Sequence, residues 1–279
     1  MAEERSSIII SVFSTSPGIG KTITAINLAA GLAIENYKVC LVDLDLQFGD
    51  VLNYLKLTSD HAHTTTIAKA QRALQTNPNN FNVNDFLIEY SYGPLRFSIL
   101  PPPQYVYDAY QIDVLATESI IKQLTYFDFV VLDLNSVFSS LNLAMLDIST
   151  VINFLGVIDF LPALKNFKIG YDTLIRFEYE ESKIRLVENR ADSQKLIDGK
   201  DVERLLGEPF YHRLPNDFPA VSKSINEGRP LMFSSPDSRL TKSFTELIGK
   251  YTNRQELSNL DIGAQEGGFF SRALNLFFS

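Results

Sequence analysis

The sequence contains little of what several protein classes require. Its 279 residues include one cysteine, Cys40, so the chain cannot form an internal disulfide. No apolar run approaches the length of about 18 residues that a membrane-spanning helix needs, and no secretory signal precedes the first apolar segment. Basic residues number 25 against 33 acidic ones, and a net charge of −8 argues against nonspecific nucleic-acid binding. We therefore expect a cytoplasmic protein with no basic surface for nonspecific nucleic-acid binding.

Apolar residues make up 45% of the chain, which is enough for a substantial core. Short apolar runs alternate with segments of helical periodicity, a pattern that predicts an α/β fold with a mostly parallel twisted sheet and helices on both faces. The expected strands span residues 8–13, 39–43, 95–100, 129–133, 150–155, 184–189 and 209–213. The expected helices include residues 21–36, 117–126, 161–178 and 200–206.

The first expected strand leads through a glycine-containing loop into a helix. Residues 14–22 read Ser-Thr-Ser-Pro-Gly-Ile-Gly-Lys-Thr. The backbone N–H groups of such a loop and helix N-terminus can bind phosphate. Lys21 can reach the terminal phosphates, and the Thr22 hydroxyl can hold Mg²⁺. The alternative is a helix N-cap beside a chance lysine. The order of strand, loop and helix favours a phosphate cradle, formed by Pro17, Gly18, Ile19, Gly20, Lys21, Thr22 and Ile23.

Two other expected strands end in carboxylates. Asp43 and Asp45 lie two apart, so they share a face if their strand continues. Asp133 ends an apolar run, where a carboxylate can hold Mg²⁺ directly or through water. The alternative for all three is a solvated or turn-capping aspartate. Like Lys21 and Asn189, Asp45 and Asp133 lie at or just after the C-terminal ends of strands, where such sheets bind ligands.

The loop, the Asp-x-Asp pair and their spacing together resemble the MinD/ParA family of deviant Walker-type ATPases, which are SIMIBI-like P-loop NTPases. Residues 43–50, Asp-Leu-Asp-Leu-Gln-Phe-Gly-Asp, are most similar to its CpaE/TadZ branch, the ATPases of Tad (Flp) pilus assembly. The resemblance continues at residues 100–103, 127–133, 189–192 and 214–230. It therefore covers roughly residues 6 to 250.

The resemblance implies an ATP- or ADP-binding domain over residues 1–255 that uses Mg²⁺ and dimerises face to face. It implies that Asp45 orients the attacking water, that Lys21 acts with it, and that Asp43 lies near the Mg²⁺ waters. Thr22, Asp43 and Asp133 are thus the expected metal residues. Asn189 is expected to read the adenine edge.

The resemblance also places Asn216 and Asp217 in a loop that closes over the base. For Asp217 a helix N-cap is the safer interpretation.

Two residues of the phosphate loop depart from the family pattern. Relatives carry a second lysine where this chain has Ser16, and that lysine crosses the dimer to the partner's phosphates. Serine is short and uncharged, and Pro17 lacks a backbone N–H. Asp133-Leu-Asn also differs from the usual Asp-x-Pro. We therefore expect slow hydrolysis unless a partner supplies a cation.

The expected function is an ATPase that positions or recruits a membrane-associated pilus or secretion assembly, peripherally at the membrane or at a cell pole. One alternative is a nucleotide-stabilised scaffold that hardly turns over. Another is a DNA-partitioning ATPase, which would carry surface cations where residues 200–256 have mixed charge.

Residues 256–279 are expected to form a joint at Gly267-Gly268 and an amphipathic segment over 269–279. As a helix, this segment gathers five apolar side chains on one face: Phe269, Phe270, Ala273, Leu274 and Phe277. Arg272 is its only charged residue, whereas membrane-surface helices usually carry several cations. The pattern favours packing against a protein partner or its own domain over a membrane. His61 and His63 predict a solvated loop rather than a metal site.

Overall fold

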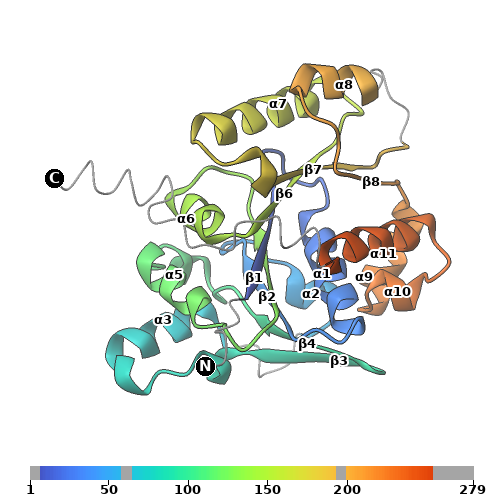
Figure 1. Ribbon diagram of the computed structural model, residues 1–279. Helices are drawn as coiled ribbons and strands as arrows, with labels where there is room; N and C mark the ends of the chain where they lie inside the picture. Colours follow the sequence, from blue (N-terminus) through green and yellow to red (C-terminus); the bar gives the residue numbers. More distant parts are fainter. Residues whose placement is uncertain (1–6, 58–64, 193–198, 254–279) are drawn as a thin grey trace.

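The computed structural model describes residues 7–57, 65–192 and 199–253. Eight strands form one sheet in the order β3-β4-β2-β5-β1-β6-β7-β8 (Figure 1). All neighbouring strands pair in parallel except β3, which runs antiparallel to β4. The expected fold class is confirmed. The strands are β1 (Ile8–Phe13), β2 (Val39–Leu44), β3 (Ile88–Tyr92), β4 (Leu95–Leu100), β5 (Phe129–Leu134), β6 (Val151–Gly156), β7 (Ile184–Asn189) and β8 (His212–Leu214).

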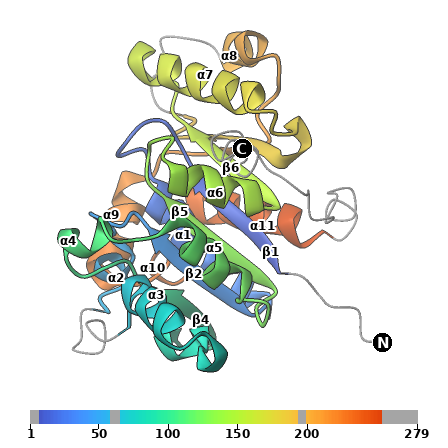
Figure 2. The same cartoon turned by 90° about the vertical axis from the view of Figure 1, so that its left-hand side faces the viewer.

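Helices cover both faces of the sheet (Figures 1 and 2). Those whose residues join the first core are α1 (Lys21–Ile34), α2 (Val51–Tyr54), α9 (Phe218–Glu227), α10 (Leu231–Ser234) and α11 (Arg239–Thr252). Those whose residues join mainly the second core are α3 (Ile67–Thr76), α5 (Val114–Lys122), α6 (Ser140–Ile148), α7 (Leu161–Arg176) and α8 (Gly199–Leu206). A short helix, α4 (Val106–Ala109), and three 3₁₀ turns, η2 (Pro78–Asn80), η3 (Val83–Phe86) and η4 (Glu181–Lys183), complete the described structure.

The central strands are buried on both faces, which explains their continuous apolar runs. In β5, Val131 packs into the core that contains Leu28 of α1. The next residue, Leu132, packs into the opposite core with Ile120 of α5 and Met145 of α6. Alternating side chains thus serve the two cores, and the carboxyl ends of these strands are held rigidly at one edge.

The structure changes the bounds of several expected elements and adds a strand that was not expected. The helix expected at 117–126 begins at Val114, because the Asp113 side chain caps it by accepting from the Ala116 N–H at 2.7 Å, and it ends at Lys122. The last strand is β8 rather than residues 209–213. Strand β3 was not predicted, and it pairs with β4 across a tight turn in which Gly93 has a φ of 57°.

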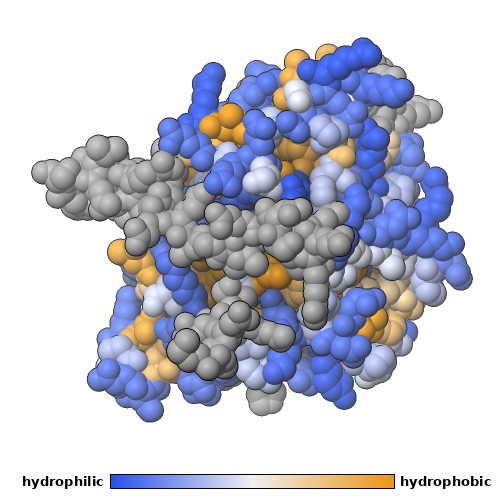
Figure 3. All heavy atoms as spheres, viewed as in Figure 1, coloured by the Kyte–Doolittle hydropathy of each residue, from blue (hydrophilic) through white to orange (hydrophobic). Residues whose placement is uncertain are grey.

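Figure 3 views the molecule from the side of Figure 1 and shows mainly hydrophilic residues with smaller hydrophobic areas outside the grey atoms. No described helix combines the length and apolar character needed to cross a membrane. The predicted joint and amphipathic segment over residues 256–279 lie outside the described residues, as do His61 and His63. Those predictions stay untested.

Candidate functional site

The loop between β1 and α1 has the backbone of an anion cradle. Gly18 and Gly20 have φ values of 68° and 96°, in the left-handed region that favours glycine. Gly20 is the N-cap of α1, and among the described residues no side chain caps this helix and no acidic residue lies in its first turn. The first N–H groups of α1 therefore lack a side-chain acceptor and can bind an anion.

Two buried carboxylates lie beside this loop. Asp43 of β2 and Asp133 of β5 are register partners on adjacent strands, and their exposed fractions are 0% and 1%. Asp43 accepts hydrogen bonds from the backbone N–H groups of Asp45 and Val51, each at 3.1 Å. Neither carboxylate oxygen of Asp133 has a hydrogen-bond partner in the described part of the chain. Asp133 is therefore a buried acid without a hydrogen-bond partner among the described residues.

Asp43 and Asp45 do not share a strand face. The expectation required the strand to continue, but β2 ends at Leu44. Asp45 is half-buried just beyond it, while the Asp43 side chain turns inward to hold the loop. Asp45 still lies near enough to Lys21 and Asp133 to raise the pKa of each.

The electrostatics of the site favour an added cation. Burial raises the pKa of Asp133 to about 7, although the Thr22 side chain and the charge of Lys21 lower it. Thr22 is thus close to Asp133. Burial, and then Asp133, raise the pKa of Asp43. Burial lowers the pKa of Lys21 against the opposing effects of Asp133 and Asp45. The charge of Lys21, which is half-buried, does not offset the burial of these acids.

The residues present fit Mg²⁺. This ion is usually held by one or two carboxylates together with phosphate oxygens and waters. Asp133 and the Thr22 hydroxyl are oxygen donors of that kind, and Asp43 lies next to them. Within residues 7–57, 65–192 and 199–253, no group of three His, Cys, Asp or Glu side chains forms a separate metal site.

Lys21 is held by a residue that the sequence analysis missed. Its ammonium donates to the Ser136 hydroxyl at 2.6 Å. Ser136 lies in the loop after β5, three residues beyond Asp133. A serine at that spacing is no signal in itself, because only the packing of β5 beside β1 brings the two loops together.

The C-terminal end of β7 and the residue that follows it hydrogen-bond to the phosphate loop. The Asn189 side-chain amide donates to the Ile19 carbonyl at 2.6 Å, and the Arg190 guanidinium donates to the Gly18 carbonyl at 2.9 Å. Arg190 has a φ of 56°, a strained value for a residue other than glycine. Arg190 was missed from sequence, although its position directly after Asn189 was a usable signal.

A pocket opens beside these contacts. Its lining residues include those predicted to surround a base, and they are Gly20, Ile23, Thr24, Asn189, Arg190, Pro215, Asn216, Asp217, Phe218, Val221, Leu240 and Phe244. Asp217 caps α9, because its carboxylate accepts from the Ala220 N–H at 3.0 Å. The cap interpretation of Asp217 is confirmed. The structure brings Asn189 and Asn216 to the same pocket, and their adenine role stays a prediction.

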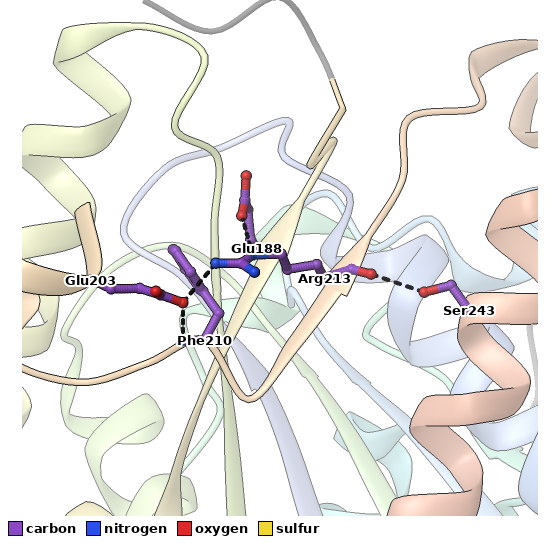
Figure 4. Close-up of polar contacts among 5 residues, drawn as sticks. All are labelled: Glu188, Glu203, Phe210, Arg213 and Ser243. Carbon is purple, nitrogen blue, oxygen red and sulfur yellow. Dashed lines mark hydrogen bonds and ion pairs between the residues drawn. The ribbon is translucent and has the colours of Figure 1, made fainter. Parts of the chain in front are cut away.

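An ion pair between an exposed arginine and a buried glutamate fixes the strand that leads into this pocket (Figure 4). Arg213 of β8 donates to the fully buried Glu188 of β7 at 3.0 Å and to Glu203 of α8 at 2.6 Å. Glu203 also accepts from the Phe210 N–H at 3.1 Å, and the Ser243 hydroxyl of α11 donates to the Arg213 carbonyl at 2.9 Å. These contacts tie β8 to both flanking helices, which positions the pocket residues that follow.

The two departures from the family pattern lie on the outer side of the phosphate loop. Pro17 is exposed, and Ser16 is half-exposed with its hydroxyl 3.5 Å from the Asn166 amide of α7. Thr15 donates to the Asn166 carbonyl at 2.7 Å. Position 16 therefore carries no charge in this chain and lies against α7.

Residues 10–231 match a known family, described as the CobQ/CobB/MinD/ParA nucleotide binding domain (CbiA). The chain belongs to this family. The match spans well over half of the chain and includes the phosphate loop, both buried carboxylates and the pocket residues up to Val221.

Solved structures of similar fold come from the same family. They include a ParA family ATPase from Chlorobium tepidum TLS, with a TM-score of 0.77, 22% identity and coverage of 88% of this chain and 98% of that one. The cell division ATPase MinD of Pyrococcus furiosus has a TM-score of 0.72 and 22% identity, and the likeness covers 91% of this chain and 99% of that one. The septum site-determining protein MinD from Pyrococcus horikoshii OT3, complexed with Mg-ADP, has a TM-score of 0.74 and 19% identity, and the likeness covers 89% of this chain and 97% of that one.

At these identities the structural likeness shows the fold alone. No curated protein matches the chain significantly. None of these similarities separates the CpaE/TadZ branch from the rest of the family.

Proposed function

We propose that this CobQ/CobB/MinD/ParA-family protein binds ATP or ADP with Mg²⁺, dimerises across its nucleotide edge, and hydrolyses ATP slowly. The observation that carries the proposal is the partnerless, buried Asp133 beside Lys21 and Thr22. A buried acid without a partner is costly. A bound cation would offset that cost, and Mg²⁺ accompanied by a nucleoside polyphosphate suits a glycine-rich cradle at a helix N-terminus.

The residues have distinct tasks in this proposal. Lys21 would neutralise charge on the terminal phosphates, Thr22 and Asp133 would hold the metal, and Asp45 would orient the attacking water. Mg²⁺, when bound, would neutralise charge that develops on the phosphates. The pocket between Asn189 and Asn216 would take the base, since a side-chain amide both donates and accepts hydrogen bonds.

Exposed apolar side chains support dimerisation. Several large ones follow the C-terminal ends of parallel strands, at the edge that carries the phosphate loop: Phe48, Tyr105, Tyr107, Tyr110, Val137, Phe160, Leu161 and Phe218. Phe48, Tyr107, Tyr110 and Phe218 have exposed fractions between 72% and 76%. Exposed apolar surface marks interaction sites. A second copy placed over this edge would cover these side chains and both nucleotides together.

The assignment to pilus or secretion assembly rests on the likeness of residues 43–50 to the CpaE/TadZ branch. In this proposal the nucleotide state of the dimer recruits or positions that assembly through a protein partner. Peripheral membrane contact through residues 269–279 is the second possibility for attachment.

A scaffold that binds ATP and hardly turns over is the alternative function. It is favoured by the uncharged Ser16 and by Pro17, which removes one N–H donor from the cradle. The guanidinium of Arg190 does not replace the missing lysine in this structure, because it donates to the Gly18 carbonyl.

Calorimetry with ATP·Mg²⁺ tests nucleotide binding. Lys21→Ala should lose affinity with its fold retained, because the ammonium is a compact charge beside the phosphates. Lys122→Ala is the matched control, since Lys122 only makes an exposed i,i+4 ion pair with Glu118. Unchanged affinity in Lys21→Ala would refute the phosphate site.

Steady-state turnover with and without lipid, together with nucleotide retention after purification, separates the two functions. Measurable turnover supports the ATPase. Retained nucleotide with no turnover supports the scaffold.

A further inference from the structure

Ser136 connects the two loops of the site through its hydroxyl. The hydroxyl accepts a hydrogen bond from the Lys21 ammonium at 2.6 Å and donates to the Ser16 carbonyl at 3.0 Å. The same Ser16 carbonyl accepts from the Ser14 hydroxyl at 2.8 Å. This arrangement uses the single hydroxyl proton of Ser136 once, and it leaves a lone pair for the lysine.

The Lys21 ammonium needs a contact that fixes its position. Lys21 has a long, flexible side chain that is half-buried and close to the Asp133 carboxylate, which has no hydrogen-bond partner in the described part of the chain. A free ammonium at this position would be drawn toward Asp133 and away from the cradle. The Ser136 hydroxyl occupies one of the three ammonium donors and leaves two for phosphate oxygens.

The orientation of the Ser16 carbonyl also matters for phosphate binding. A carbonyl oxygen that faced the cradle would repel phosphate, and the residue after it, Pro17, offers no N–H in compensation. The hydroxyls of Ser136 and Ser14 both bind this carbonyl, which keeps it turned toward the β5 side of the loop.

We propose that Ser136 is the positioning residue of this phosphate site: it presets Lys21 for the β- and γ-phosphates of a nucleotide and turns the Ser16 carbonyl away from them. The inference rests on the nucleotide site of the proposed function. It makes the loop after β5 a part of nucleotide recognition as well as a carrier of Asp133. Ser136 acts through Lys21 and the loop, and it does not itself act on the reacting atoms.

The test measures ADP·Mg²⁺ and ATP·Mg²⁺ affinity by calorimetry for four variants of the full chain. Ser136→Ala should weaken both nucleotides roughly tenfold to hundredfold, the range expected for losing a hydrogen bond to a charged group. Ser136→Cys keeps the size of the side chain but bonds poorly, so it should show a comparable loss. Ser136→Thr retains the hydroxyl at a half-buried position and should bind within threefold of the wild type.

Ser139→Ala is the matched control in the same loop. Its hydroxyl caps α6 by accepting from the Asn142 N–H at 3.2 Å and makes no contact with the phosphate loop. It should lower thermal stability while leaving affinity within twofold. If Ser136→Ala does not fold, Ser136→Cys and Ser136→Thr still decide the question.

Wild-type affinity in Ser136→Ala or Ser136→Cys would overturn the inference, and so would an equal loss in Ser136→Thr, which would indicate a general disturbance of the loop. A wild-type protein that binds neither nucleotide would instead refute the proposed function itself.

Discussion

Replacing Asp133 by asparagine is expected to stabilise the protein in the absence of Mg²⁺ and nucleotide. Burial raises the pKa of this carboxyl from 3.8 to about 7, so its ionised form is penalised in the folded state. A shift of that size corresponds to about 4 kcal/mol at pH 7. Burying the asparagine amide without hydrogen-bond partners costs about 1–3 kcal/mol, which offsets part of the stability gained by removing the charge. The net stabilisation is therefore about 1–3 kcal/mol, which raises Tm by roughly 3–10 °C.

The sign of the pH dependence follows from the same shift. The folded state binds the Asp133 proton more tightly than the unfolded state does, so this residue's effect on stability is most favourable below pH 4. Its contribution is lost as the pH rises toward about 7. The variant should lack this loss, and the difference between the two proteins should grow between pH 4 and 7.

Thermal unfolding with and without ATP·Mg²⁺ measures both effects. ATP·Mg²⁺ should raise the Tm of the wild type and have little effect on Asp133→Asn, because the metal ligand is gone. Asp113→Asn is the matched control. Asp113 is an exposed helix cap whose side chain accepts from the Ala116 N–H, and asparagine caps equally well, so its replacement should change neither the Tm nor the response to ATP·Mg²⁺. A lower Tm for metal-free Asp133→Asn, or an unchanged response to ATP·Mg²⁺, would refute the reasoning.

Three further predictions concern other parts of the chain. Ser16→Lys, combined with Pro17→Gly, should raise the single-turnover rate of ATP hydrolysis at least tenfold, because a cation at the phosphates is worth roughly 10³–10⁵ in rate. If the wild type is already fast and the variant shows no gain, another group supplies the charge. Burial lowers the pKa of His212, whose Nε2 lies 2.9 Å from the Ser243 carbonyl. His212 should therefore lower the free energy of unfolding as the pH falls below about 6.5, where the unfolded imidazole binds protons first. Between pH 7 and 5, denaturant unfolding should show a smaller change in this free energy for His212→Asn than for the wild type, and an equal change would contradict the prediction. Deleting residues 268–279 should leave ATP binding intact and abolish localisation; salt-sensitive flotation of the full chain on anionic vesicles would favour a membrane over a protein partner, and unfolding of the truncated chain would refute both.

The alternation of apolar runs with helical periodicity was enough to predict the sheet, because strands buried on both faces must be apolar throughout. The order of strand, loop and Gly-Lys-Thr likewise predicted the cradle, since the glycines and the helix start are local features. Asp217 as a helix cap was predictable for the same reason: a cap acts within three residues of its own position. Strand β3 was missed although its sequence, Ile-Glu-Tyr-Ser-Tyr before a Gly-Pro turn, alternates apolar and polar residues; as an antiparallel edge strand it lies outside the alternation of parallel strands and helices on which the prediction rested.

Contacts between loops were decided only by the tertiary structure. The register of β2 with β5 sets Asp43 beside Asp133. Ser136 meets Lys21 across 115 residues of chain, and Asn189 meets Ile19 across 170. The sequence by itself determined which residues lie at the carboxyl edge of the sheet, because the end of a strand is indicated by the local pattern of apolar residues. Which of them touch depended on the strand order, since hydrogen bonds over a few ångströms require neighbours that chain spacing does not specify.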